Sequence, residues 1–210
     1  MSEGSRIHPT AIVEDGVVIG PGTSIWDSVH VRGPATIGRH CIVGEKTYIA
    51  YGVRIGDYVK VNAQAYVCTG VTIEDRVFVA AGVVFTNDRF PRAFADGHDG
   101  LAPSEPNEET LETVVRTGAT IGARAVIGPG LEIGAFAMIG MGAVVAADVP
   151  PHALVFGSPA RVRGWVCVCG TPVVRGDDAH ATVPQTRTCE RCGRRYRFGG
   201  EDTRLLPEVA

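Results

Sequence analysis

Residues 31–66 read VRGPAT IGRHCI VGEKTY IAYGVR IGDYVK VNAQAY, so an aliphatic residue opens every block of six. The same spacing holds without a slip from Ile7 to Phe85 and resumes from Val115 to Val145. Neither a helix, with a period of 3.6, nor a simple strand, with a period of 2, requires a repeat of six. Short strands joined by fixed tight turns do require it. The chain is therefore predicted to be all-β, a parallel β-helix of hexapeptide repeats.

The aliphatic anchors are expected to point into the prism and fill it. Three hexads close one triangular coil, so twenty hexads predict six to seven coils. Glycine often follows the anchor, and we expect it to serve a turn that needs a positive φ. The eight glycines concerned are Gly20, Gly38, Gly44, Gly56, Gly122, Gly128, Gly134 and Gly140.

Composition narrows the setting and the partners. The chain has 210 residues and a formal net charge of −3, so no overall field favours nucleic acid or an anionic membrane. The N-terminal segment, MSEGSRIHPT, lacks the apolar core of a signal peptide, and no apolar run approaches the roughly 20 residues of a membrane span. We therefore expect a cytoplasmic protein that binds neither membrane nor nucleic acid.

The repeat is interrupted once, and it ends before the chain does. Residues 88–113 form a Pro-rich, acidic insertion, and a loop of this length inside a regular solenoid is usually functional or mobile. From Trp165 onward the hexads are replaced by an Arg-rich segment with two cysteine pairs. We predict a β-helix domain over residues 1–164, a small module over 165–200 and a tail over 201–210.

The C-terminal module carries the pattern of a metal site. Cys167-x-Cys169 and Cys189-x-x-Cys192 form two knuckles, which together suit a tetrahedral Cys₄ zinc site. A module this small, with few core residues, also needs a staple in order to fold. We predict a zinc-ribbon-like module with structural zinc. A pair of disulfides is the alternative, although a reducing cytosol disfavours it.

Two stretches carry a family resemblance. One is VFTNDRFPR at residues 84–92, and the other comprises VRTGATIGA at 115–123, IGMGAVVAADVP at 139–150 and VFGSPAR at 155–161. Together they resemble the left-handed β-helix acetyltransferases that act on 3-amino groups of nucleotide-linked sugars. Within that group the chain is similar to the UDP-2-acetamido-3-amino-2,3-dideoxyglucuronate and the dTDP-3-amino-3,6-dideoxyhexose N-acetyltransferases. The resemblance implies acetyl-CoA as co-substrate and a nucleotide-linked amino sugar as acceptor. Because a solenoid buries only its own axis, a homotrimer with active sites between subunits is also expected.

The resemblance implies a positioning role for Asn87, whose counterpart in the family hydrogen-bonds the attacking amine. An asparagine cannot act as a base, but its carbonyl oxygen can accept a hydrogen bond from that nitrogen. A capping role in the corner turn is the structural alternative. His98, inside the insertion, is the alternative catalytic residue, since related enzymes that acylate hydroxyls or antibiotics use a loop histidine as general base.

Residues that are three hexads apart stack in successive coils, and this register predicts the substrate cleft. Val84 falls above Tyr66, Tyr48 and His30, which present polar-tipped rings beside the edge that carries Asn87. We predict that these rings contact the nucleotide, with packing in a trimer interface as the alternative. Asp88 and Arg92, from the same sequence block as Asn87, complete the predicted substrate site. Arg92 would pair with a diphosphate or a sugar carboxylate.

The late sequence block implies contacts to coenzyme A. Arg116 and the backbone at three small residues would flank the pantetheine, and the segment near residue 160 would meet the adenosine phosphates. The predicted residues are Arg116, Gly118, Ala119, Gly140, Ser158, Pro159 and Arg161.

Other functions of the fold fit the residues less well. A hydratase of the γ-carbonic-anhydrase type needs three histidines that converge on zinc, whereas the nearest pair here, His30 and His40, falls on different faces of the prism. A non-catalytic scaffold would leave the insertion and the Asn87 block without a role. UDP-linked and dTDP-linked acceptors both remain open, as does an acyltransferase with a different acceptor.

Overall fold

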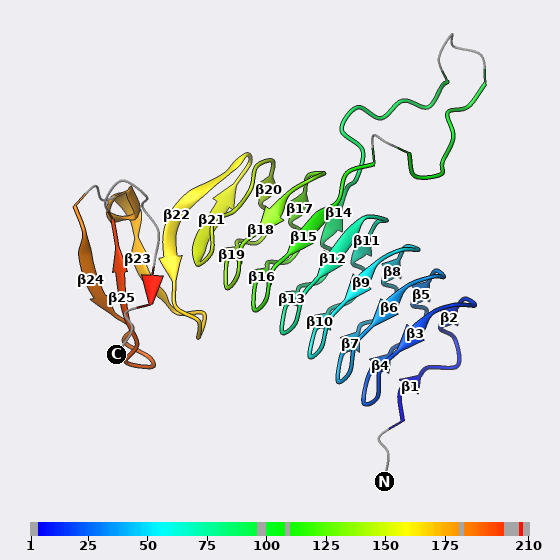
Figure 1. The fold of residues 1–210 in the computed structure, drawn as a ribbon, viewed down its shortest axis with the longest axis horizontal. Helices are drawn as coiled ribbons and strands as arrows, with labels where there is room; N and C mark the ends of the chain where they lie inside the picture. Colours follow the sequence, from blue (N-terminus) through cyan, green and yellow to red (C-terminus); the bar gives the residue numbers. More distant parts are fainter. Residues whose placement is uncertain (1–3, 96–99, 108–109, 181–182, 200–205, 208–210) are drawn as a thin grey trace.

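A computed structural model describes residues 4–95, 100–107, 110–180, 183–199 and 206–207. In this part of the chain, β1 to β21 wind into a solenoid whose short strands stack in three parallel sheets (Figure 1). Sheet A contains β1 (Arg6–Ile7), β4 (Ser24–Ile25), β7 (Ile42–Val43), β10 (Lys60–Val61), β13 (Phe78–Val79), β16 (Thr120–Ile121), β19 (Met138–Ile139) and β21 (Ala153–Gly157), and continues into β22 (Ala160–Val166) and β23 (Pro172–Arg175). Sheet B contains β2 (Ile12–Val13), β5 (His30–Val31), β8 (Tyr48–Ile49), β11 (Tyr66–Val67), β14 (Val84–Phe85), β17 (Val126–Ile127) and β20 (Val144–Val145). Sheet C contains β3 (Val18–Ile19), β6 (Thr36–Ile37), β9 (Arg54–Ile55), β12 (Val71–Ile73), β15 (Thr113–Val115) and β18 (Glu132–Ile133).

The register of three hexads per coil, predicted from the repeat, is confirmed. His30 pairs with Tyr48, and Tyr66 pairs with both Tyr48 and Val84. Ile73 pairs with Val115 across the insertion, so anchor still stacks on anchor and the insertion does not disturb the phase. The predicted six to seven coils become eight levels on sheet A, because β21 adds a strand beyond the last hexad anchor.

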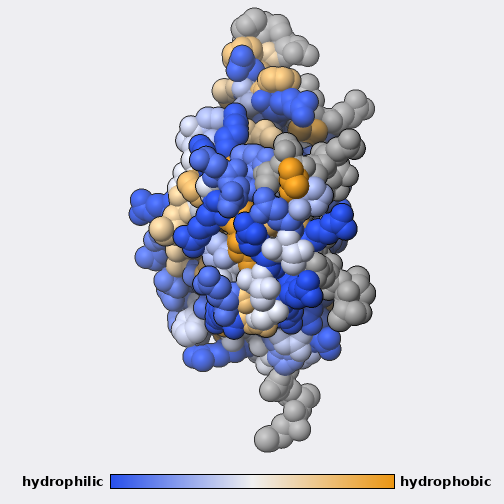
Figure 2. Space-filling model, turned by 90° about the vertical axis from the view of Figure 1, so that its left-hand side faces the viewer, coloured by the Kyte–Doolittle hydropathy of each residue, from blue (hydrophilic) through white to orange (hydrophobic). Residues whose placement is uncertain are grey.

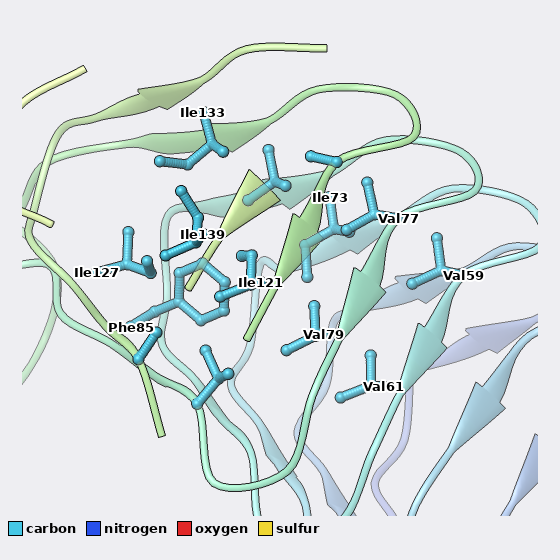
Figure 3. Packing of buried hydrophobic residues seen from close by; sticks show 14 of the residues in the cluster. Val59, Val61, Ile73, Val77, Val79, Phe85, Ile121, Ile127, Ile133 and Ile139 are labelled. Atoms are coloured by element: carbon cyan, nitrogen blue, oxygen red, sulfur yellow. The ribbon is translucent and has the colours of Figure 1, made fainter. Parts of the chain in front are cut away.

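The anchors fill the prism as predicted (Figure 3). Ile73, Phe85, Ile121 and Ile127 expose 1% or less of their surface. Full burial of such a side chain contributes about 1.5–3 kcal/mol, so the stacked anchors are the main source of stability. The first coil is the exception: Ile7 is 45% exposed because no coil lies beneath it.

The glycines after the anchors serve a different purpose from the one predicted. None of the eight has a positive φ; the left-handed residues lie three positions after the anchor, and they include Ser28, His40 and Tyr58 as well as glycines. The neighbouring coil passes so close to the glycines that a side chain would collide with it. A Cβ on Gly44 would lie 2.6 Å from the backbone nitrogen of Ala63.

We expect Gly44→Ala to lower the free energy of unfolding by about 1–3 kcal/mol, because backbone atoms of the next coil must move. Gly142→Ala is the matched control: it has a φ of 66° but nothing within 4 Å of its Cβ position. It should lose only about 1–2 kcal/mol, the cost of a left-handed alanine. Thermal melts of both variants show which of the two loses more stability. A Gly142 variant that melts below the Gly44 variant would contradict close packing as the reason for the glycine.

The insertion leaves the solenoid between β14 and β15 and projects away from it (Figure 1). Its base is closed: Leu111 donates its backbone N–H to the carbonyl of Asn87 at 2.9 Å, and Asp88 forms a β-bridge with Thr110. Both ends of the insertion are thereby held at the corner between sheets B and C.

The C-terminal module is joined to the solenoid by a shared sheet. The predicted boundary between residues 164 and 165 falls inside β22, which pairs with β21 on one side and β23 on the other. A 3₁₀ helix (Gly176–His180) and a sheet of β24 (Gln185–Thr188), β25 (Arg195–Phe198) and β26 (Leu206–Pro207) follow. Trp165 and Tyr196 are buried between these elements, and the view onto this end of the molecule is mostly hydrophilic (Figure 2). The module thus covers the last coil.

Within the described residues, no helix has the length and apolar character that crossing a membrane requires.

Candidate active site

A cavity of about 740 Å³ opens at the corner between sheets B and C, where the base of the insertion meets the solenoid wall. Its volume lies in the range of small-molecule sites. The cavity brings together five of the predicted site residues: Tyr48, Tyr66, Asn87, Asp88 and Arg92. Predicted His30 does not line it, but its ring contacts Tyr48 edge-on at a centroid distance of 5.5 Å.

Two tyrosines form one wall of the cavity. The rings of Tyr48 and Tyr66 stack with their centroids 5.2 Å apart and their planes at 7°. Tyr66 is 44% exposed, and partial burial raises the pKa of its hydroxyl, which therefore stays protonated at neutral pH. The wall offers an aromatic edge together with hydroxyl groups that donate hydrogen bonds, a surface that suits a base or a sugar.

Asn87 is held in one orientation at the head of the cavity. Its Nδ2 donates to the backbone carbonyl of Thr69 in the coil below, at 3.2 Å. Because a carbonyl can only accept, this contact assigns the amide nitrogen to the Thr69 side and leaves Oδ1 as an acceptor on the other side. The structure therefore combines the two interpretations of Asn87, a bond that secures the corner and an oriented acceptor in the cavity. The alternative catalytic residue, His98, lies outside the described residues.

Asp88 and Arg92 come from the base of the insertion. Asp88 is fixed by its β-bridge to Thr110, and the Nη1 of Arg92 donates to the carbonyl of Pro91 at 3.1 Å. Both residues line the cavity together with Glu105. The insertion thus brings charged side chains to the cavity whose solenoid wall contains the stacked tyrosine rings.

The lining residues that were not predicted for the site include four of the solenoid wall beside the tyrosines: Arg32, Tyr51, Cys68 and Thr69. The register of three hexads already places Thr69 and Tyr51 one and two coils below Asn87 in the same column, although the prediction did not assign them to the site. Burial raises the pKa of the Cys68 thiol to about 12, which excludes a thiolate nucleophile at neutral pH.

The residues predicted to bind coenzyme A lie on three different edges of the prism. Arg116 stands between sheets C and A, where it forms ion pairs with Glu74 at 2.9 Å and Glu132 at 2.7 Å. Gly118 belongs to the same corner, with a φ of 72°. Gly140 lies between sheets A and B, beneath Phe156.

Ala119, whose backbone was predicted to flank coenzyme A, has a side chain that packs inside the prism. Its side chain is fully buried, its N–H donates to the carbonyl of Arg116, and its C=O accepts from Phe78 in the coil below. Ala119 fills the core of the prism, because it occupies the second inward-facing position of its hexad. The predicted contact of the backbone near Ala119 with coenzyme A stays a prediction.

The segment near residue 160, predicted to meet the adenosine phosphates, forms the hairpin between β21 and β22, with Ser158 and Pro159 in its turn. Pro159 and Arg161 line a second cavity of about 440 Å³ together with Asp148. This cavity begins directly after β20, and Asn87 follows β14, two strands earlier in sheet B. At a spacing of about 4.8 Å per strand, the two cavities are separated by about 10 Å along one edge.

The four cysteines of the C-terminal module converge. All four Sγ atoms lie within 4.8 Å of one another, with 3.3 Å between Cys167 and Cys192 and 3.6 Å between Cys169 and Cys189. A tetrahedral site with Zn–S bonds of about 2.3 Å places its sulfurs about 3.8 Å apart, so the donor set and its spacing fit zinc. The Tyr196 hydroxyl lies 3.0 Å from the Cys167 sulfur and accepts from the N–H of Val168.

Two of these thiols are already biased toward the thiolate form. The Thr171 side chain and backbone lower the pKa of Cys169 to about 6, and the Arg194 backbone lowers the pKa of Cys192. Burial raises the pKa of Cys167 to about 12. Four adjacent thiolates repel one another, so the protein alone does not stabilise the fully ionised set; a divalent cation would.

Comparison with known proteins places these features in a family. A model described as bacterial transferase hexapeptide (six repeats) matches residues 16–51 and 52–87, and one described as hexapeptide repeat of succinyl-transferase matches residues 117–147. The dTDP-3-amino-3,6-dideoxy-alpha-D-galactopyranose 3-N-acetyltransferase of Aneurinibacillus thermoaerophilus is 41% identical over 197 residues, covering 94% of this chain and 93% of that protein.

Two solved structures share the fold at lower identity. A point mutant of AntD, an N-acyltransferase from Bacillus cereus, in complex with dTDP and coenzyme A, has a TM-score of 0.51 and 19% identity, covering 78% of this chain and 83% of that one. The polySia-specific acetyltransferase NeuO has a TM-score of 0.50 and 17% identity, covering 82% and 80%. At these identities the two structures support the fold alone.

Proposed function

Because the chain belongs to the bacterial hexapeptide-repeat acetyltransferases, we propose that it transfers the acetyl group of acetyl-CoA to the 3-amino group of a dTDP-linked 3-amino-3,6-dideoxyhexose. The observation that carries this proposal is the oriented amide of Asn87 in a cavity walled by stacked tyrosines. The 41% identity to a 3-N-acetyltransferase of that substrate class supports the choice of acceptor.

In the proposed reaction the sugar amine attacks the thioester carbonyl carbon, the new C–N bond forms and the C–S bond breaks. The amine is less basic than lysine, whose reference pKa is about 10.4, so a neutral fraction is present near pH 7. The proton released from nitrogen goes to the departing thiolate, and no protein base is needed. Asn87 Oδ1 accepts a hydrogen bond from the amine and so directs the lone pair of the amine nitrogen at the carbonyl carbon. Positioning of this kind contributes on the order of 7–11 kcal/mol.

Coenzyme A is proposed to lie along the edge between sheets B and C. The thioester would meet the sugar amine at Asn87, and the adenosine end would reach the second cavity, where Pro159 and Arg161 stand. Arg161 supplies a cation for the phosphates, since its guanidinium is exposed and bonds only to the carbonyl of Ala160 among the contacts of the described residues.

We also propose a homotrimer with its active sites between subunits. One prism spreads Arg116, Gly118 and Gly140 over two edges away from Asn87, so a neighbouring subunit would be needed to bring such residues to the cavity. Outward-facing Val84 and Val144, each 36% exposed, offer apolar surface beside the tyrosine wall. Sedimentation equilibrium should give three times the mass of the 22.2 kDa chain. A monomer that retains full activity would exclude shared sites.

Structural zinc on the four cysteines and a cytoplasmic setting complete the proposal. Cys167, Cys169, Cys189 and Cys192 would hold the ion, and their free thiols fit a reducing compartment.

The proposed activity is tested by incubating the protein with acetyl-CoA and a panel of dTDP- and UDP-linked 3-amino and 4-amino sugars while free thiol release is followed. We expect turnover on a dTDP-linked 3-amino sugar and little on the 4-amino compounds. Turnover on the UDP-linked compound alone would move the acceptor to the glucuronate class. Binding of coenzyme A without turnover on any amino sugar would refute the proposal.

A further inference from the structure

Arg32 is a positively charged residue that lines the main cavity, and it belongs to the solenoid wall and not to the insertion. It follows β5, three coils below the strand that precedes Asn87. The other charged residues of the cavity, Asp88, Arg92 and Glu105, belong to the insertion. Positive charge on the solenoid side is therefore concentrated at the end of the cavity that lies away from Asn87.

The guanidinium of Arg32 is fixed by the coil beneath it. Glu14 accepts from Arg32 Nε at 3.2 Å through Oε1 and at 3.4 Å through Oε2. The same carboxylate contacts His30 Nε2 at 2.8 Å and accepts from the N–H of Gly33 at 3.2 Å. These contacts, led by the one with His30, lower the pKa of Glu14, so the carboxylate stays ionised at neutral pH.

Among the described residues, the terminal nitrogens of Arg32 have no carboxylate partner, and Tyr48 is the hydrogen-bonding neighbour beside them. Glu14 engages Nε, and the guanidinium carbon lies 5.4 Å from the centroid of the Tyr51 ring, a cation–π contact. Stacking and the Nε bond together hold the plane of the guanidinium, and the Arg32 side chain is still 42% exposed.

The position of Arg32 indicates what it binds. The Tyr51 ring, on which its guanidinium stacks, lies two coils below Asn87, or about 10 Å at 4.8 Å per coil. A hexose ring and its diphosphate span a separation of this order when the amine is at Asn87. An arginine whose Nη atoms are not paired with a carboxylate is suited to bidentate binding of phosphate oxygens.

We propose that Arg32 binds the diphosphate of the nucleotide-linked substrate through its Nη atoms, and that Glu14 positions it. This inference rests on the proposed function, because it takes the amine at Asn87 as the origin of the distance. Arg32 touches the substrate, whereas Glu14 acts through Arg32. The stacked tyrosines then lie beside the diphosphate and the nucleoside.

The test measures binding of dTDP, UDP and thymidine by calorimetry, with no acetyl transfer required. We expect Arg32→Ala to weaken dTDP binding by about 10- to 100-fold, the value of a hydrogen-bonded charge, and to leave thymidine binding unchanged. Arg32→Lys should recover only part of the loss, because an ammonium lacks the planar fork that binds two oxygens at once. Glu14→Gln should weaken dTDP binding less than Arg32→Ala does.

Arg39→Ala is the matched control. Arg39 has the same arrangement on another corner, with Nε 2.8 Å from Asp57 Oδ2 and its guanidinium 5.9 Å from the Tyr58 ring centroid, but it lies outside the cavity. Its removal should leave dTDP binding unchanged. In turnover assays Arg32→Ala should raise the KM for the nucleotide sugar and change kcat by no more than a few-fold.

Two results would overturn the proposal: dTDP binding that is unchanged in an Arg32→Ala protein with the wild-type melting temperature, or wild-type protein that binds neither dTDP nor UDP. Binding of dTDP that depends on Arg32, combined with no acetyl transfer to any amino sugar, would refute the proposed function and support the diphosphate site.

Discussion

Replacing Asn87 by alanine is expected to lower kcat for acetyl transfer by about 10²-fold, the cost of a misplaced reacting group. The amide is held by its bond to the Thr69 carbonyl, so Oδ1 is an acceptor in a fixed position before the substrate arrives. The KM for the nucleotide sugar should change little, because most contacts to that substrate lie elsewhere in the cavity. Steady-state kinetics with a dTDP-linked 3-amino sugar measures both constants.

Three variants separate positioning from other effects. Asn62→Ala removes the same amide from another corner and should retain wild-type kcat. His98→Ala removes the alternative general base and should also retain it. Asn87→Asp keeps an acceptor oxygen but turns the Thr69 contact into a repulsion between two acceptors, so it should be nearly as slow as Asn87→Ala. Loss of activity in His98→Ala with activity kept in Asn87→Ala would reverse the assignment.

The path of the solenoid could be predicted from the sequence because one period determines both the direction of each side chain and the stacking of the coils. A spacing of six fixes which residues point inward, and three such spacings fix which residues stack, so Tyr48 and Tyr66 could be aligned beneath Val84. The reason for the glycines could not be found in this way. The collision of a Gly44 Cβ with Ala63 depends on how far each coil bends inward, which the period does not specify.

The repeat did not decide which site residues could be predicted: Asp88 and Arg92 of the insertion were predicted from the block they share with Asn87, whereas Arg32, inside the repeat, was not. Asp88 and Arg92 reach the cavity only because the base of the insertion folds back against the corner. Arg32 was missed although it stacks on Glu14 in the same register, because an exposed arginine near an acid is usually only a solvated ion pair. Its place in the cavity wall distinguishes it, together with Nη atoms that pair with no carboxylate among the described residues.

The module behaves differently, since its fold follows from no repeat. Its sheet of β24 to β26 is short, and the largest buried rings in it, Tyr196 and Phe198, both come from β25. Cys167 and Cys189, each 1% exposed, are the buried half of the sulfur cluster. We expect that, without a bond between the two knuckles, so small a set of buried residues does not keep this sheet folded.

We therefore expect Cys189→Ser to abolish zinc binding and to unfold the module. Structural zinc contributes an apparent ~10–16 kcal/mol to the folding of zinc-finger peptides at about pH 7, far more than so few buried residues supply. The wild-type protein should contain about one zinc ion per chain by atomic emission, the number that a Cys₄ site holds. The variant should contain almost none, and trypsin should cleave it rapidly at the arginines of β24 and β25. A chelator should reproduce both effects in the wild type.

Cys41→Ser is the control for these measurements. Cys41 is also 1% exposed, but it lies alone in the solenoid, where its sulfur is 3.1 Å from the carbonyl of Gly56. A serine keeps that hydrogen bond, so zinc content and resistance to trypsin should match the wild type.

Thiol titration distinguishes a zinc site from two disulfides. Four cysteines that react only after chelation indicate zinc, whereas a metal-free wild type that gains four reactive thiols on reduction would identify two disulfides and refute the zinc site. Because the Sγ pairs at 3.3 Å and 3.6 Å are close to the spacing of a tetrahedral site and far longer than an S–S bond of about 2.05 Å, zinc is the expected result.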